Sequence, residues 1–151
     1  MPQFQIHNSK FFDVREWVDE KTWLQRNVKS AQMVDPVIVR IADLFREKVG
    51  QPVYINTWHN GGHFVASGFR AVWEKQGGKL SQHRCGRAVD LKVNGMNSVD
   101  MLGVVMRNLP EFLELGLTVI ENVEKTPTWL HLDCRPRTIG MLDTITFVDP
   151  V

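Results

Sequence analysis

Two short segments of the sequence carry side chains that could bind a metal ion. The first spans residues 129–133, WLHLD, in which Leu130 and Leu132 alternate with His131 and Asp133 as in a strand. Because successive side chains of a strand point to opposite faces, His131 and Asp133 share one face, about 6–7 Å apart along the strand. We expect the leucines in the core. The other face then offers an imidazole and a carboxylate to one site.

The second segment spans residues 81–90, SQHRCGRAVD, in which His83 and Asp90 lie on either side of a glycine-containing turn. Their spacing is too wide for one helical turn, but a loop that enters a strand can return both side chains to one point. With His131 they would make a three-ligand zinc site with an open fourth position, which keeps a net positive charge. Such a zinc ion lowers the pKa of a bound water to about 7 and polarises a carbonyl, as amide hydrolysis requires.

Both segments resemble elements of one enzyme group. Residues 81–90 match the signature S-x-H-x-x-G-x-A-x-D of the D-alanyl-D-alanine carboxypeptidase group of zinc peptidases, and residues 129–131 resemble its later W-x-H element. The resemblance covers roughly residues 52–135 of the chain. The group includes bacterial carboxypeptidases, phage L-alanoyl-D-glutamate endolysins and Hedgehog-like domains, so the resemblance implies a small α+β zinc fold that acts on peptidoglycan stem peptides. By resemblance, the zinc ligands would be His83, Asp90 and His131.

An arginine upstream also fits the group. Residues 67–70, SGFR, resemble its S-G-[FY]-R element, whose arginine would contact substrate or stabilise the oxyanion. Arg70 is therefore a candidate catalytic residue, and a structural ion pair is the alternative for it.

The catalytic carboxylate departs from the pattern of the group. Many members place a Glu or Asp three residues before the last zinc histidine, and here that position is Thr128. Other members carry an H-x-D sequence, so Asp133 is our candidate, either as general base or as an acceptor that orients an imidazole. Glu121 and Glu124 are the alternatives for the general base.

Other histidines and cysteines offer weaker sites. Cys85 and Cys134 follow His83 and His131 closely, so a closed site of two histidines and two cysteines or a cysteine nucleophile is conceivable. We favour two reduced thiols that merely lie near the site. For His59 and His63 the i, i+4 spacing would suit a metal on a helix, but two glycines separate them and favour a loop without a metal role.

The elements that must position these residues follow from capping signals and periodicity. Asp13 with Glu16 predicts a helix start, and Asp35-Pro36 predicts a second helix that continues to Gly50. The first helix would carry Phe12, Trp17, Trp23 and Leu24. A third helix is expected over residues 98–109, stopped by Pro110. Strands are expected over residues 52–56, 88–93, 117–121, 129–133 and 145–148.

Helices grouped before strands favour an α+β domain with a mainly antiparallel sheet and N-terminal and flanking helices. We expect one zinc peptidase-like domain over residues 1–151, with a helical part at about 12–50 and the metal-site sheet at about 52–148. The fold would resemble the Hedgehog and D-Ala-D-Ala-peptidase domains.

Composition limits the partners. The 151 residues include 18 Lys and Arg against 17 Asp and Glu, which argues against a nucleic-acid binder. Between residues 75 and 92, five basic residues accompany the single acid Asp90, so we expect either a positive rim beside the metal or a solvated face. The basic residues are Lys75, Lys79, Arg84, Arg87 and Lys92.

The sequence also bears on where the protein is located. The N-terminus lacks the pattern of a signal peptide, and no apolar run approaches the roughly 20 residues that span a bilayer. We expect a monomer that is made in the cytoplasm without stable membrane insertion. It would reach the wall through a holin-type pore or inside a virion.

Together these features predict a zinc metallopeptidase, either a carboxypeptidase or an endopeptidase of cell-wall peptides, of the kind used in lysis by a phage or prophage. The competing hypothesis is a non-catalytic zinc-binding or wall-peptide-binding domain of a phage particle. Thr128, at the position where many members carry a carboxylate, favours that alternative.

Overall fold

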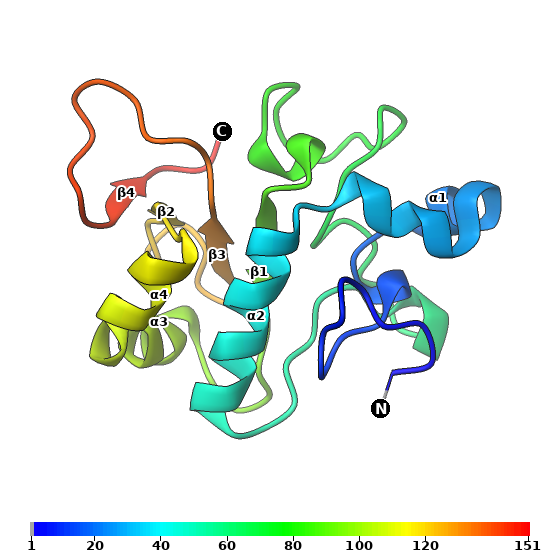
Figure 1. The fold of residues 1–151 in the computed structure, drawn as a ribbon, viewed down its shortest axis with the longest axis horizontal. Coiled ribbons are helices and arrows are strands. Elements are labelled where there is room, and N and C mark those ends of the chain that lie inside the picture. Colours follow the sequence, from blue (N-terminus) through cyan, green and yellow to red (C-terminus); the bar gives the residue numbers. More distant parts are fainter. Residues whose placement is uncertain (1) are drawn as a thin grey trace.

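Four strands form one mixed sheet in the order β1-β3-β2-β4. The strands are β1 (Ala88–Leu91), β2 (Val119–Glu121), β3 (Leu130–Asp133) and β4 (Thr146–Val148). β3 pairs antiparallel with β1 and β2, whereas β4 joins β2 in parallel. The computed structural model, which describes residues 2–151, confirms the predicted α+β class (Figure 1).

The longest helix begins and ends where its capping residues predict. In α2 (Pro36–Val49) the Asp35 carboxylate accepts a hydrogen bond of 2.9 Å from the backbone N–H of Val37, and Gly50 ends the helix in a left-handed conformation. Most of its apolar side is buried and packs against β1 and the two helices that follow in the chain. That side includes Ile38, Ile41 and Phe45. The predicted helix is therefore confirmed.

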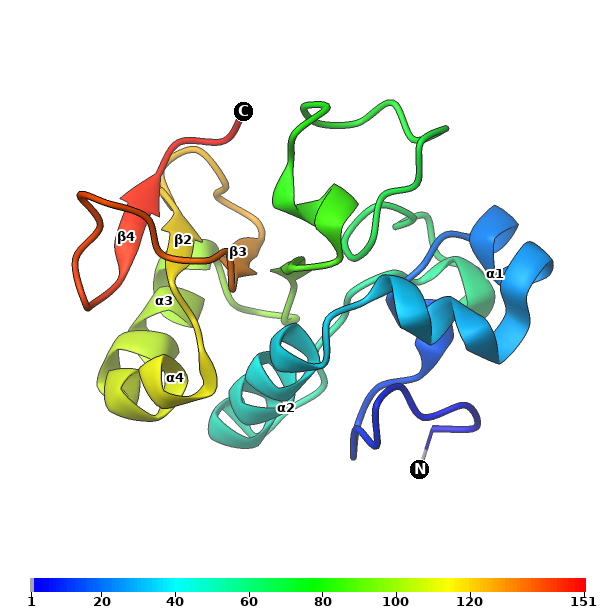
Figure 2. The same cartoon turned by 45° about the horizontal axis from the view of Figure 1, so that its top comes forward.

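Two short helices replace the one expected over residues 98–109. α3 (Ser98–Arg107) ends at Asn108, and α4 (Leu109–Leu115) begins immediately afterwards with Pro110 in its first turn. A proline is tolerated there because the first turn of a helix does not need its N–H. Figure 2 shows α2, α3 and α4 on the same side of the sheet, where they enclose the core.

The N-terminal part is less helical than predicted. The capping box of Asp13 and Glu16 exists, but it begins a three-residue 3-10 helix, Val14–Glu16. A new helix, α1 (Glu20–Arg26), is capped by Asp19, and a 3-10 segment, Asn27–Met33, follows it. Trp17 is fully buried and Trp23 packs against the core, whereas Leu24 is 69% exposed. The chain therefore turns after Glu16 instead of continuing as one helix.

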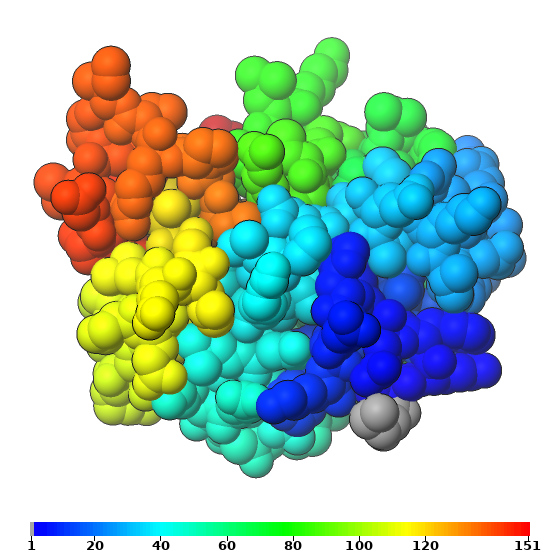
Figure 3. All heavy atoms as spheres, viewed as in Figure 1, coloured from blue at the N-terminus to red at the C-terminus, as the bar shows by residue number. Residues whose placement is uncertain are grey.

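The strand expected over residues 52–56 is reduced to a single bridge between Tyr54 and Lys92. Asn56 leaves the strand direction because its amide group donates to the Val18 carbonyl and accepts from the Ser67 backbone N–H. Loops then lead to a short 3-10 helix, Gln82–Cys85. Figure 3 shows that the loops near residue 80 and residue 140 protrude from the body. None of the described helices is long and apolar enough to cross a membrane.

Candidate metal centre

Three elements bring His83, Asp90 and His131 together. Asp90 on β1 and His131 on β3 are direct partners in the antiparallel register, and His83 lies in the 3-10 helix Gln82–Cys85 that precedes β1. As predicted, Leu130 and Leu132 of β3 face the core and His131 lies on the opposite face. The register of two strands thus places a carboxylate beside an imidazole.

The serine and glycine of residues 81–90 shape the turn that carries His83. The hydroxyl of Ser81 accepts a hydrogen bond from the backbone N–H of His83, and Gly86 ends the turn with φ 69°. A Cβ atom on Gly86 would lie 1.9 Å from the carbonyl oxygen of Met33. This position therefore requires glycine for both its backbone angle and its space.

The distances between the three facing atoms suit a small tetrahedral ion. Nε2 of His83 lies 3.2 Å from Nδ1 of His131 and 3.2 Å from Oδ1 of Asp90, and Nδ1 of His131 lies 3.0 Å from the same oxygen. Tetrahedral coordination with bonds of about 2.0–2.1 Å separates neighbouring ligand atoms by about 3.3 Å. The triangle is therefore close to one face of such a polyhedron.

Hydrogen bonds behind each imidazole turn its other nitrogen toward this triangle. Nδ1 of His83 donates to the carbonyl oxygen of Gly68 at 2.8 Å, and Nε2 of His131 donates to Oδ2 of Asp133 at 2.9 Å. The remaining nitrogen of each neutral ring presents a lone pair to the Asp90 carboxylate. Three acceptor atoms thus converge on one point, where a cation is needed.

Burial makes this arrangement electrostatically demanding. His83, Asp90 and His131 are 2%, 8% and 3% exposed. Burial lowers the pKa of His83, and although burial alone would raise the pKa of Asp90, the two imidazoles hold it well below its usual range. Burial disfavours a charge on His131, but hydrogen bonds to Asp133 and Asp90 raise its pKa to about 9. Without a metal, a proton on His131 is the cation that the protein itself can supply.

Asp133 lies behind His131 and not in the triangle. It is fully buried, and its carboxylate also accepts hydrogen bonds of 2.8 Å and 2.5 Å from the Arg135 guanidinium. Burial would raise the pKa of Asp133, but the bonds from Arg135 and His131 keep it low. Of the two roles considered for Asp133, this geometry fits the acceptor that orients the imidazole.

Glu121 is the carboxylate at the edge of the triangle. It ends β2, and one further step of the β2-β3 register places it opposite His131. Its Oε1 lies 3.4 Å from Nδ1 of His131, and its side chain is 14% exposed. Burial raises the pKa of Glu121. The charge of His131 opposes this increase, and the charge of Asp90 adds to it. By contrast, Glu124 is exposed in the turn that follows.

The strand expected over residues 117–121 contains the signal that favours Glu121, because side chains two residues apart in a strand share a face. It places Glu121 on the same face as Val119, which pairs with Asp133, so the side chain points to the face of the imidazole. Sequence spacing alone could not rank it above Glu124, because the pairing of β2 with β3 decides which carboxylate faces the site.

Arg70 lies beside the same carboxylate. Its Nη2 is 3.3 Å from Oδ2 of Asp90, and its Nε donates to the Ala66 carbonyl at 2.8 Å. A Cβ atom on Gly68, within the SGFR element, would lie 2.5 Å from the carbonyl oxygen of Trp17, so close packing fixes this segment. Arg70 therefore makes the structural ion pair and also borders the space in front of the site.

That space is a cavity of about 340 Å³. This is within the size range of small-ligand sites. Its walls include Phe64, Val65 and Trp129, and its polar groups include Arg70, Asp90 and Lys92. A small molecule or one peptide residue could enter it beside Asp90.

Only one of the five basic residues proposed for a positive rim lines this cavity. Arg84 donates to the carbonyl oxygens of Ala71, Glu74 and Gly78 and so holds the protruding loop together. Arg87 faces Asp35 at 3.9 Å, and Lys75 and Lys79 are exposed on the loop. Lys92 reaches the cavity, where burial lowers its pKa to about 8. The expected rim is thus reduced to Lys92 together with Arg70.

The remaining histidines and cysteines lie outside the triangle. A loop was expected here, but His59 belongs to the short 3-10 helix Trp58–Asn60; Gly61 ends that helix before His63, so the two histidines do not share a helix. Cys85 is exposed, and burial raises the pKa of the Cys134 thiol to about 12, which disfavours a thiolate.

In the part of the chain that the structure describes, His83, Asp90 and His131 form a buried group that could hold a metal ion. No protein-family model, curated protein or solved structure matches the chain. The function of the chain must therefore be inferred from the geometry of this group and from the residues around it.

Proposed function

We propose that the protein is a zinc-dependent peptidase that hydrolyses an amide bond in peptidoglycan stem peptides. The convergence of His83 Nε2, Asp90 Oδ1 and His131 Nδ1 at 3.0–3.2 Å carries this proposal. Two imidazoles and one carboxylate are the donor set of many catalytic zinc sites, which leave a further position for water or substrate. The choice of cell-wall peptides as substrate rests on the resemblance of residues 81–90 and 129–131 to the carboxypeptidase group.

Around the zinc ligands, each residue has a distinct role in this proposal. Zinc, when bound, lowers the pKa of a water molecule and polarises the scissile carbonyl. Glu121 accepts a proton from the attacking water molecule while the oxygen of that water bonds to the carbonyl carbon. Glu121 then delivers this proton to the leaving nitrogen as the C–N bond breaks. Arg70 stabilises negative charge on the carbonyl oxygen. Asp133 holds His131 in position.

The position and the burial of Glu121 support its assignment as general base. Burial disfavours its charged form, so the carboxylate is a better proton acceptor than an exposed one. Its 3.4 Å distance from Nδ1 of His131 places it next to the zinc ligands. Asp133, which we considered first for this role, is already engaged by His131 and Arg135.

As a cell-wall peptidase, the protein would act in lysis by a phage or prophage and reach the wall through a holin-type pore or inside a virion. The competing proposal is a zinc-binding domain that recognises wall peptides without cleaving them. Thr128, an exposed residue at the cavity, favours it because many members of the resembled group have a carboxylate at this position.

One experiment separates the two proposals. Purified protein is analysed for zinc and incubated with peptidoglycan, and the muropeptides are identified by mass spectrometry with and without a chelator. We expect about one zinc per chain and new stem-peptide ends that appear only when zinc is present. Zinc-loaded protein that binds muropeptides without cleaving them would support the binding domain, and equal activity after complete zinc removal would refute both.

A further inference from the structure

Lys92 is held in the cavity by contacts that a surface lysine would lack. Its Nζ donates to the hydroxyl of Ser67 at 2.7 Å and to the backbone carbonyl of Asp90 at 3.1 Å, and it lies 4.3 Å from the centre of the Phe64 ring. Its backbone N–H and carbonyl both bond to Tyr54, which fixes the position of its Cα atom. The ammonium group is therefore anchored at the cavity and not free in solvent.

This ammonium group makes no ion pair with a carboxylate among the described residues. No carboxylate oxygen of the described chain lies within 4.0 Å of Nζ, which is the limit for an ion pair. The two acceptors that Nζ contacts are a hydroxyl and a carbonyl. A lysine ammonium has three N–H donors, so one donor remains for a ligand. A partly buried charge without a counter-ion is costly, and a bound anion would remove that cost.

The charged side chains that line the cavity also favour a bound anion. Arg70 and Lys92 supply two positive charges, and Asp90 is the one acid among the lining residues. Its Oδ2 lies 3.3 Å from the Arg70 guanidinium, and its Oδ1 belongs to the metal triangle. When Asp90 also binds a divalent cation, its single negative charge faces both that cation and the Arg70 guanidinium, and cannot neutralise Lys92 as well. The cavity then carries an excess of positive charge that an incoming carboxylate can neutralise.

We infer that Lys92 makes this cavity a carboxylate subsite, so that it selects substrates with an acidic group next to the scissile amide. The inference rests on the proposed function and adds a specificity-determining residue to it. The apolar walls formed by Phe64, Val65 and Trp129 would hold the carbon atoms of the residue that bears the carboxylate. Either the free carboxylate at a peptide terminus or an acidic side chain has the required chemistry.

Matched peptides test the inference and distinguish the two sources of the carboxylate. One pair differs by a terminal carboxylate against a carboxamide, and a second pair differs by Glu against Gln beside the scissile bond. We expect zinc-loaded wild-type protein to prefer the carboxylate member of one pair by about 10- to 100-fold in kcat/KM. Wild-type protein that hydrolyses both members of each pair equally well would overturn the inference without any variant.

Lys92→Met assigns the preference to this side chain. It preserves most of the apolar stem and removes the charge, so the ratio of kcat/KM between the carboxylate and the carboxamide substrate should fall to within about threefold. Lys125→Met is the matched control, because Lys125 is exposed and does not line the cavity. A Lys92→Met protein that keeps its fold, its zinc and its full preference would refute the assignment.

A binding measurement keeps this inference separate from the proposed activity. N-acetylalanine and N-acetylalaninamide are titrated into zinc-loaded protein by calorimetry, and Lys92→Arg serves as a second, charge-retaining variant. We expect tighter binding of the carboxylate by wild type and Lys92→Arg, and no discrimination by Lys92→Met. Selective binding without peptide cleavage would refute the peptidase activity but support the carboxylate subsite. Peptide cleavage without selective binding would support the peptidase activity but refute the subsite.

Discussion

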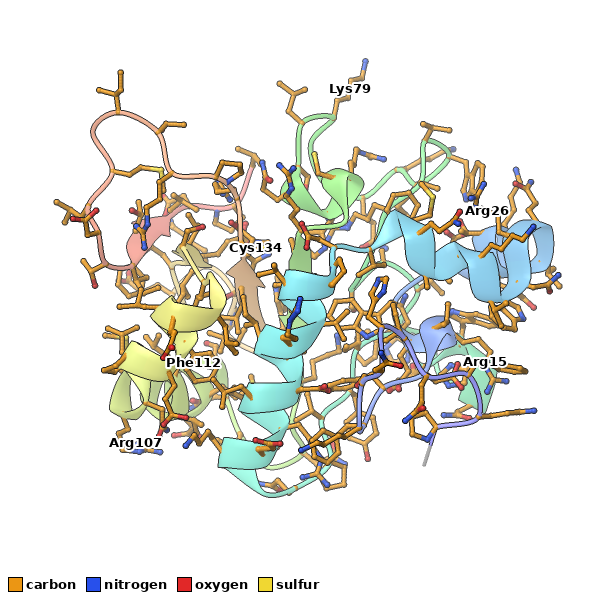
Figure 4. The ribbon with its side chains drawn as sticks, viewed as in Figure 1. Arg15, Arg26, Lys79, Arg107, Phe112 and Cys134 are labelled. Atoms are coloured by element: carbon orange, nitrogen blue, oxygen red, sulfur yellow. The ribbon has the colours of Figure 1, made fainter. Side chains whose placement is uncertain are left out.

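Two buried polar clusters of this protein differ in how their charges are satisfied. At the N-terminal side, the Asp13 carboxylate accepts bonds from the backbone N–H of Phe4 and Arg15 and from the Arg15 guanidinium, all at 2.9–3.0 Å. At the sheet, the inward atoms of His83, Asp90 and His131 are all acceptors when the imidazoles are neutral. Figure 4 shows Arg15 on one side of α2 and Cys134, which follows β3, on the other.

A structural cluster differs from a ligand site in whether the chain itself supplies the cation. Arg15 supplies a cation to Asp13 from within the chain, and the cluster needs nothing more. At the sheet, Arg135 neutralises Asp133, which lies behind His131, and Arg70 reaches only the outer oxygen of Asp90. No described lysine or arginine reaches the centre of the triangle, where the chain itself can supply only a proton on His131. A buried set of converging acceptors is therefore a better sign of a metal than the number of charged residues.

The largest effect should follow from removing a ligand at the sheet. We expect His83→Ala or His131→Ala to reduce zinc affinity by much more than about 100-fold. Mutation of a residue that only hydrogen-bonds to a metal ligand typically reduces the affinity by roughly 10–100-fold. Competition with a chromophoric chelator measures the affinity, and circular dichroism checks the fold. Asp13→Asn is the control from the other cluster and should bind zinc like wild type. Equal zinc loss in Asp13→Asn would abolish the distinction between the two clusters.

A smaller loss, confined to catalysis, is expected for Glu121→Gln. Removing the general base should lower kcat by about 10²- to 10⁴-fold and leave the zinc content unchanged. Glu124→Gln is the matched control, because the same change is made in an exposed residue three positions later. Zinc loss in Glu121→Gln would make Glu121 a ligand instead, and full activity would remove it from the mechanism.

Asp133→Asn should have an intermediate effect on the metal and a small one on the chemistry. The amide oxygen can still accept from Nε2 of His131, but the negative charge is lost, so zinc affinity should fall about 10–100-fold. At saturating zinc we expect kcat to remain within about tenfold of wild type. A loss of kcat as large as that of Glu121→Gln, with zinc bound, would identify Asp133 as the base.

The smallest effect concerns Glu16 in the N-terminal cluster. Burial raises its pKa to about 7, so the folded protein favours the protonated form. Stability from this residue is full below the unfolded pKa of about 4.5 and declines as the pH rises through about 7, by about 1–3 kcal/mol.

Glu16→Gln should remove this decline, because glutamine stays neutral and can still accept the hydrogen bond from the Asp13 N–H. Urea unfolding between pH 4.5 and pH 8 measures the difference between the two proteins. Identical pH profiles for wild type and Glu16→Gln would contradict the prediction.

Local signals predicted some elements well and others poorly. The capping residue Asp35, the proline after it and Gly50 determined the ends of α2, because each satisfies a local backbone requirement. Pro110 misled the prediction, since a proline that stops one helix can also begin another. Asp13 likewise marked a helix start correctly but contained no information on the length of the helix. Residues 52–56 had strand composition but lost their pairing to tertiary hydrogen bonds.

The candidate site could likewise be predicted from the sequence only in part. Alternation in residues 129–133 was enough to place His131 and Asp133 on one face, because side-chain direction in a strand is a local property. The sequence could not indicate that Asp133 would contact the far nitrogen of His131, or that Glu121 would approach the near one. Both depend on ring orientation and on strand pairing.

By itself, the sequence determined the α+β class, the ends of α2 and the residues capable of binding a metal, because these follow from capping, periodicity and side-chain chemistry. Only the tertiary structure decided which of these residues meet. The β1-β3 register places Asp90 beside His131, and the turn before β1 returns His83 to the same point. Such contacts join residues up to 48 positions apart, and no local rule specifies them. Packing of the whole chain brings three acceptors to one buried point and leaves Lys92 without an ion pair among the described residues.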